Sequence, residues 1–370
     1  MRTVDWVAYM QEVEGPMLQN DFNYEHLEGQ TGPLVYPAGF VYIFVLLRFF
    51  SNSGTNIFLA QLLFAGIHTL LIFVVVGGIY SNVNGVPDFA LPLVVLSRRV
   101  HSIFSLRLFT DGVAMLYAYS SVALAMRNRW TLACILFSLG VSIKMNVLLM
   151  APGLAVLLVQ SNGIIGAALR VGLCGLIQLI LAGPFIAINP LGYMKRSFDL
   201  GRVFLLKWSV NFKFLSEPFF QSPSLAVTLL GLTLFTWLLF GHYRWAKSSG
   251  GLFRMVINSR LFERRALNAE HVAMCMLESN LIGIVFARSM HYQFYCWYAH
   301  VIPLYAWRSS LGRRSSFLAL GMVVAIEVCF NIFPATPLSS FVLQLTNIML
   351  LISIFLSPIT SMKSKEEAKV

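Results

Sequence analysis

Long blocks of apolar residues recur from one end of this sequence to the other. Two clear ones are Ile57–Ile79 and Ile164–Ile188, each long enough to cross a hydrocarbon core of about 30 Å as a helix that rises about 1.5 Å per residue. Only 12% of the 370 residues are charged, whereas a soluble domain carries about 25%. Because the chain has too little polar surface to stay in solution, we predict an all-α polytopic membrane protein.

The charged residues that remain are mostly basic. Lys and Arg number 27 against 16 Asp and Glu, which gives a net charge of +11. In a soluble protein this excess would suggest nucleic-acid binding, but in a membrane protein basic residues gather in cytosolic loops. We therefore expect the lipid bilayer as a partner and no nucleic acid.

Counting the basic loops back from the C-terminus predicts the topology. If the lysine-containing tail 362–370 is cytosolic, the basic stretch 242–270 is a cytosolic loop as well. The segments 1–56 and 189–224 then lie on the opposite side of the membrane. All of these segments are expected to belong to one membrane-embedded domain, residues 1–361.

Two apolar blocks affect the number of spans. Tyr36–Phe50 is too short to cross a bilayer, so we expect an interfacial or re-entrant helix there. Gln293–Trp307 is counted as a span. With these assignments the chain is predicted to have about eleven spans.

Two basic segments fall on the non-cytosolic side and so break the charge rule. One is Ser97–Asp111, and the other is 189–224. Their basic residues are Arg98, Arg99, His101, Arg107, Lys195, Arg196, Arg202, Lys207 and Lys213. Basic loops on the non-cytosolic side oppose the usual distribution of charge and therefore need a second reason. An anionic ligand at that membrane surface is one. Pairing with the acidic N-terminal segment or with lipid headgroups is the alternative.

Several charged residues lie within or between apolar stretches, where a charge is expensive unless it is used or paired. For Lys144 a functional and a structural role are both open. For Glu278 and Glu327 we expect interhelical hydrogen bonds. Asp5, a lone carboxylate among apolar neighbours, could serve as a general base or as a helix N-cap.

The five cysteines lie singly within apolar stretches, without a CxxC pair or a histidine at metal-binding spacing. We expect free, buried thiols and no structural metal site.

Six motifs occur one after another along the chain and are interpreted together. They are Asp5-Trp6-x-x-Tyr9-Met10, Thr31–Gly39, Arg99-x-His101-Ser102-Ile103-Phe104, Lys144–Leu149, Phe198–Phe204 and Arg288-Ser289-x-His291-Tyr292-Gln293-Phe294-Tyr295. This set resembles the dolichyl-phosphate-mannose-dependent α-1,3-mannosyltransferases of asparagine-linked glycan assembly. The resemblance runs from Asp5 to about Pro337.

The resemblance implies a multi-pass enzyme of the endoplasmic reticulum membrane with the GT-C glycosyltransferase fold, a luminal active site and a cytosolic C-terminus. Its donor would be dolichyl phosphate β-mannose, and its acceptor dolichyl-pyrophosphate-linked Man5GlcNAc2. Because a β donor yields an α product, the reaction would invert the anomeric centre, and no cofactor is implied. The family has a span before its catalytic aspartate, which we expect this chain to lack.

The resemblance also implies roles for single residues. Asp5 would be the general base that deprotonates the acceptor hydroxyl. The donor phosphate would be bound by His291, Arg288, Gln293, Arg107 and Lys144. The acceptor and its pyrophosphate would be bound by Arg202, Lys207, Tyr36 and Trp6. No metal is expected. The alternatives are a transferase for another dolichyl-phosphate-linked sugar and an inactive, N-terminally truncated form.

Overall fold

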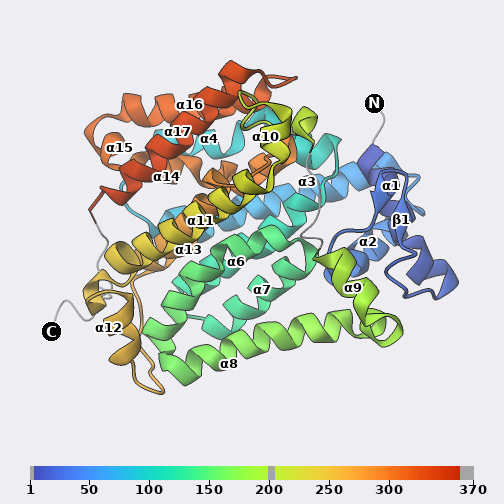
Figure 1. The fold of residues 1–370 in the computed structure, drawn as a ribbon, viewed down its shortest axis with the longest axis horizontal. Coiled ribbons are helices and arrows are strands. Elements are labelled where there is room, and N and C mark those ends of the chain that lie inside the picture. The colour runs from blue at the N-terminus through green and yellow to red at the C-terminus, as the bar shows by residue number, and fades with distance from the viewer. Residues whose placement is uncertain (1–3, 199–204, 359–370) are drawn as a thin grey trace.

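The computed structural model describes residues 4–198 and 205–358, and helices dominate it (Figure 1). The α-helices are α1 (Val4–Glu12), α2 (Ala38–Phe50), α3 (Ile57–Phe73), α4 (Pro92–Val95), α5 (Arg98–His101), α6 (Thr110–Met126), α7 (Trp130–Ile143), α8 (Ala151–Ile188), α9 (Pro190–Ser197), α10 (Glu217–Gln221), α11 (Pro223–Phe240), α12 (Leu252–Ile257), α13 (Ala269–Val285), α14 (Ile302–Arg308), α15 (Ser310–Arg314), α16 (Ser316–Asn331) and α17 (Pro337–Phe355). Three short helical turns also bear on the site: η6 (Met145–Met150), η7 (Leu206–Trp208) and η10 (Tyr292–Trp297).

The strands of the described residues are β1 (Glu28–Gly29) and β2 (Gly32–Pro33), which pair antiparallel. They form a small hairpin in the N-terminal segment and not a layer of the fold. The prediction of an all-α membrane protein is therefore confirmed at the level of fold class.

Five helical stretches of the described residues are long and apolar enough to cross a membrane. They are Ile57–Asn82, Asp88–Leu106, Met145–Ile188, Pro223–Trp245 and Pro337–Phe355. Three shorter apolar helices, α2, α7 and α16, accompany them. By length and composition this supports a multi-pass protein, and the number of about eleven spans stays a prediction.

One apolar block and one basic segment fold differently from the expectation. Gln293–Trp307 is not a continuous helix, because η10 and a second short turn precede α14. Ser97–Asp111, expected as a loop, begins with α5, whose first turn is capped by the Ser97 hydroxyl accepting from Val100 N. The expected short helix at Tyr36–Phe50 is present as α2.

Helix starts follow capping residues that are visible in the sequence. α11 begins after Ser222, whose hydroxyl accepts from Leu225 N, and proline follows at the first helical position. α17 begins in the same way after Thr336, with Ser339 completing a capping box.

The buried apolar residues form a main core that reaches from Trp6 to Ile354. Two carboxylates within the helical bundle are hydrogen-bonded between elements. Glu278 in α13 accepts from Arg244 and Trp245, each at 2.8 Å. Glu327 in α16 accepts from Tyr295 at 2.6 Å and from Ser97 at 2.8 Å. The predicted interhelical hydrogen bonds of both glutamates are thus confirmed.

The five cysteines are free, and all but the half-buried Cys174 are buried, as expected. α1, α2 and α9 lie together at one end of the bundle, and α12 lies at the opposite end (Figure 1). The candidate active site lies at the first of these ends.

Candidate active site

Asp5 lies in the first turn of α1 and is half-buried. Burial raises the pKa of its carboxyl group above the ordinary value, and the positive charge of Arg107 partly offsets this shift. Asp111 also raises the pKa of Asp5, whereas Lys144 lowers it. The charges that act on Asp5 thus come from three places: Arg107 lies before α6, Asp111 lies in α6, and Lys144 lies before η6.

A buried ion pair joins the start of α6 to the turn after α7. Lys144 Nζ donates to Asp111 Oδ1 over 2.7 Å, and the Asp111 side chain is fully buried. Trp297 Nε1 donates to the same oxygen, also over 2.7 Å. Asp111 Oδ2 has no hydrogen-bond partner in the described part of the chain. Asp111 thus fixes Lys144 with one oxygen, while its other oxygen is buried without a partner among the described residues.

Aromatic rings surround the ammonium group of Lys144. Its Nζ lies 5.3 Å from the ring centroid of Tyr36, 5.0 Å from that of Phe294 and 5.9 Å from that of Trp297. These distances allow cation–π attraction, which favours the charged amine. The rings of Phe294 and Trp297 stack with centroids 4.0 Å apart, and His291 stacks on Phe294 at 5.1 Å. One aromatic stack therefore connects Lys144 with His291.

A close approach of two helices sets the position of Tyr36. A Cβ at Gly39 in α2 would lie 2.0 Å from Ser142 Oγ in α7, so the helices can meet here only at a glycine. Ser142 lies just before Lys144 in the chain, and Tyr36 stacks on Phe40 with centroids 4.7 Å apart. α2 thereby holds Tyr36 against the Lys144 side chain.

The backbone around Arg288 is fastened by Asn211. Asn211 Nδ2 donates to Ala287 O over 2.7 Å, and Asn211 Oδ1 accepts from Met290 N over 2.8 Å. The segment containing Asn211 therefore braces the corner between α13 and η10, where Arg288 and the half-buried Gln293 lie.

Two predicted acceptor-binding residues belong to the segment that contains Asn211. Lys207 is exposed in η7, and its Nζ lies 5.0 Å from the Trp208 ring centroid. Arg202 lies outside the described residues. The structure thus places Lys207 in the segment that braces the corner, and its contact with an acceptor remains a prediction.

Arg107 is exposed and close enough to Asp5 to influence its pKa. The next residue, Leu108, is buried with a left-handed φ of 55°, which costs a bulky L-residue about 1–2 kcal/mol. This backbone turn buries Leu108 while Arg107 stays at the surface. Such strain is concentrated at functional sites.

Trp6 is placed differently from the prediction. Its side chain is fully buried, its Nε1 donates to Gly54 O over 2.9 Å, and its ring contacts Phe44 and Phe64. A side chain without exposed surface offers nothing to a sugar, so the predicted acceptor contact does not fit this geometry. Trp6 instead anchors α1 to α2 and α3.

Three residues of the site were missed from the sequence: Asp111, Asn211 and Trp297. Only Asp111 gave a usable signal, because it is a carboxylate directly before a long apolar segment, where an unpaired charge is expensive. Asn211 and Trp297 act through partners that are distant in the sequence.

Among residues 4–198 and 205–358, no group of three or more His, Cys, Asp or Glu could hold a metal ion. Two of the three charged groups that act on Asp5, Arg107 and Lys144, are basic, and aromatic rings surround Lys144. This arrangement suits an anion bound by protein cations.

Comparison with known proteins identifies the family. The family model described as ALG3 protein matches residues 2–340. The chain belongs to the ALG3 protein family. The family resemblance read from the six motifs is thereby confirmed.

Curated ALG3 relatives cover nearly the whole chain. A Mus musculus protein named Dol-P-Man:Man(5)GlcNAc(2)-PP-Dol alpha-1,3-mannosyltransferase is 41% identical over 369 residues, which cover 99% of this chain and 84% of the relative. The Arabidopsis thaliana protein of the same name is 40% identical over 368 residues, covering 96% of this chain and 82% of the relative. The Homo sapiens protein of that name is 41% identical over 372 residues, covering 99% and 84%.

Proposed function

We propose that this ALG3 family member transfers mannose from dolichyl phosphate β-mannose to dolichyl-pyrophosphate-linked Man5GlcNAc2, forming an α-1,3 linkage. The observation that carries the proposal is the half-buried carboxylate of Asp5, whose pKa the positive charges of Arg107 and Lys144 lower against the effect of burial. The printed names of the relatives, which state this donor, acceptor and linkage, support it.

The proposed chemistry is a single inverting displacement. The acceptor 3-hydroxyl oxygen attacks the anomeric carbon of mannose while its proton passes to the Asp5 carboxylate. The bond between the anomeric carbon and the phosphate oxygen breaks, and its electron pair leaves with dolichyl phosphate. A carboxylate with a raised pKa accepts a proton more readily than an ordinary aspartate, which suits a general base.

The leaving group gains negative charge during this step, because a phosphodiester becomes a phosphomonoester. Groups that bind the phosphate more strongly as this charge develops lower the barrier. Lys144 is held for this role by Asp111 and by the surrounding rings. His291 lies at the far end of the aromatic stack, and Arg288 lies in the corner beside it. We assign both side chains to the same phosphate.

We further infer the GT-C fold with about eleven spans, a luminal active site and a cytosolic C-terminus in the endoplasmic reticulum membrane. The distribution of basic loops supports this orientation, since 242–270 and the C-terminal tail fall on one side. A protease-sensitive tag after Val370 should be cleaved in intact microsomes. Protection of that tag until the membrane is opened would contradict the orientation.

The reaction is tested with the purified chain in mixed micelles, a short-chain dolichyl-phosphate mannose and lipid-linked Man5GlcNAc2. The expected product is heavier by one hexose, which an α-1,3-specific mannosidase removes. Dolichyl-phosphate glucose serves as the control donor. Equal transfer from both donors, or a product resistant to the mannosidase, would contradict the proposal.

His291→Ala should lower kcat strongly and change the donor KM less. The reason is that a hydrogen bond to the departing phosphate strengthens as charge develops, so its loss affects the transition state most. Arg288→Ala should instead raise the donor KM, because a fixed cation binds the ground-state phosphate as well. Steady-state kinetics with the short-chain donor measure both variants. Unchanged kinetics in His291→Ala would move the phosphate site toward Arg107 and Lys144.

Chelation should leave most of the transfer activity intact. The groups proposed to hold the phosphate are cationic side chains, and a protein cation can balance a monophosphate without a bound metal ion. Initial rates with and without excess EDTA measure this. Inhibition by EDTA that Mn²⁺ or Mg²⁺ reverses would show that the phosphate requires a metal.

A further inference from the structure

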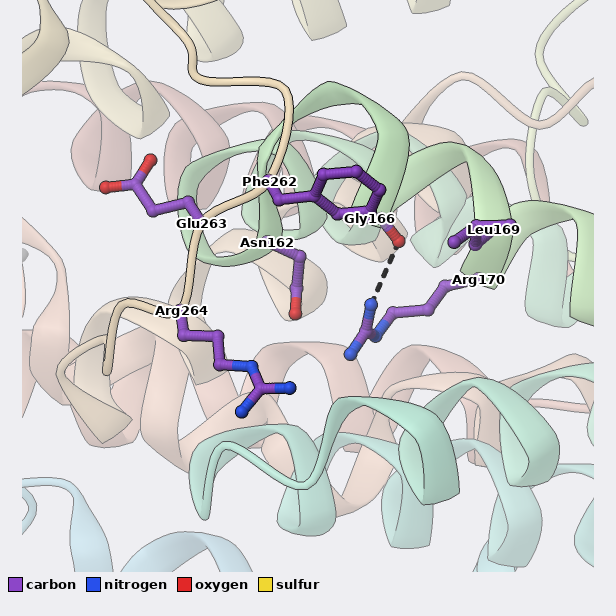
Figure 2. Close-up of a pocket in the computed structure, with 7 residues that line it drawn as sticks. All are labelled: Asn162, Gly166, Leu169, Arg170, Phe262, Glu263 and Arg264. Atoms are coloured by element: carbon purple, nitrogen blue, oxygen red, sulfur yellow. Dashed lines mark hydrogen bonds between the residues drawn. The ribbon is translucent and has the colours of Figure 1, made fainter.

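A second cationic site lies at the end of the bundle opposite Asp5, where the loop after α12 folds onto α8. It is a cavity of about 440 Å³. Figure 2 shows the guanidinium groups of Arg170 and Arg264 pointing into the same space from different elements, with the Asn162 side chain between them. Glu263, the acidic residue of the lining, points away from this space. Two guanidinium groups and one amide therefore point into the cavity, and the carboxylate among its lining residues does not.

The walls of the cavity are fixed by backbone contacts. α8 is broken at Gly163, which has a φ of 72°, and the loop lies directly against this break. Glu263 N donates to Asn162 O over 3.0 Å, and Ile164 N donates to Arg260 O over 3.0 Å. A Cβ at Gly163 would lie 2.4 Å from Arg260 O, so this approach requires glycine. The cavity is thus built into the fold.

The two guanidinium groups lack acidic partners within ion-pair distance in the described part of the chain. Arg170 donates to Gly166 O in its own helix over 3.0 Å, and its Nε is buried with no hydrogen-bond partner among the described residues. Two converging arginines repel each other unless an anion lies between them. The planar guanidinium group matches the paired oxygens of a phosphate.

The surroundings of the cavity are apolar and exposed. Leu169 and Phe262, which line it, are each 63% exposed, and Leu179 and Ile180 continue this exposed apolar surface along α8. In the most apolar part of the stretch 145–188, only 11% of the residues are buried inside the protein, which is the pattern of a helix surface exposed to lipid. Arg170 is an expensive residue within an apolar span, and its side chain turns back toward the helix break and donates to Gly166 O, as a long basic side chain does when it reaches for a membrane surface.

We propose that this cavity binds the phosphate-bearing headgroup of an anionic membrane lipid, whose acyl chains lie along the exposed face of α8. The site is separate from the mannosyl-transfer site: α8 continues for 25 residues beyond the break, from Ile164 to Ile188, or about 37 Å. A basic pocket between helices at one membrane surface is a typical headgroup site. The proposal does not depend on the transfer reaction.

The test is lipid binding to the full purified chain, measured by native mass spectrometry. Phosphatidylinositol and phosphatidylcholine with the same acyl chains are titrated separately. We expect preferential retention of phosphatidylinositol, which Arg170→Gln and Arg264→Gln should each weaken about tenfold or more, because each removes a charge-assisted hydrogen bond. Arg314→Gln, which removes an exposed arginine from α15, is the matched control and should bind like the wild type.

Three outcomes would overturn the proposal. The first is equal retention of the two lipids by the wild-type chain. The second is unchanged phosphatidylinositol binding in Arg264→Gln, an exposed position whose substitution should not disturb folding. The third is displacement of the lipid by inorganic phosphate at equal concentration, which would assign the cavity to a soluble anion. Arg170→Lys, which keeps the charge and loses the paired geometry, should bind between the wild type and Arg170→Gln.

Discussion

Asp5→Asn should lower the rate of mannose transfer by about 10²- to 10⁴-fold, the range in which general bases contribute. The substitution keeps the size of the side chain and removes its ability to accept the acceptor proton. The rate is measured with the short-chain donor under saturating conditions, and folding is checked by thermal unfolding in detergent. Glu28→Gln, an exposed position in the same N-terminal segment, is the matched control and should keep its activity.

The pH profile separates a base from a merely structural carboxylate. Because burial raises the pKa of Asp5, the wild-type kcat/KM should fall as the pH decreases through a value above that of an ordinary aspartate. At lower pH the carboxyl group is protonated and cannot accept the proton. In Asp5→Asn this acid limb should disappear from the residual activity. Near-wild-type turnover in Asp5→Asn would remove Asp5 from the mechanism.

Lys144→Met should both unfold more easily and lose transfer activity. Removing one partner of a buried ion pair leaves an uncompensated charge, which costs about 3–5 kcal/mol, and here that charge is the fully buried Asp111 carboxylate. Thermal unfolding measures the loss of stability, and initial rates measure the loss of activity. Asp111→Asn should be destabilised for the reciprocal reason.

The double variant, Lys144→Met with Asp111→Asn, distinguishes a structural from a functional lysine. It leaves no unpaired charge, so much of the lost stability should return. If Lys144 holds the donor phosphate, activity should stay low although the protein is stable again. Recovery of activity together with stability would assign Lys144 to structure alone.

Short sequence patterns predicted those parts of the candidate site that depend on residues close together in the sequence. The short helix α2 follows from an apolar run too short to span, and Asp5 and His291 follow from motifs of a few residues. The partner of Lys144 could not be predicted in this way, because Asp111 is 33 residues away. Trp297, which shares the same carboxylate oxygen, is 186 residues from Asp111.

The spans were harder to count because an apolar block is not always a straight helix. The block 293–307 contains Tyr and Trp side chains with polar groups that need partners when buried. Tyr295 bonds to Glu327, Trp297 to Asp111 and Tyr298 to Asn347. These partners lie on three different helices. One regular helix could not point all three side chains toward them, whereas the short turns can.

The ion pair at Lys144 also sets an order of events during synthesis. Asp111 and Lys144 leave the ribosome early, whereas Trp297 follows about 150 residues later, which takes roughly 8–30 s at about 5–20 residues per second. Until then the carboxylate lacks the indole donor and the aromatic cover that the finished protein gives it. The nascent chain therefore carries an incompletely sheltered charge pair while these residues are added, and the candidate active site is completed only when its last aromatic segment arrives.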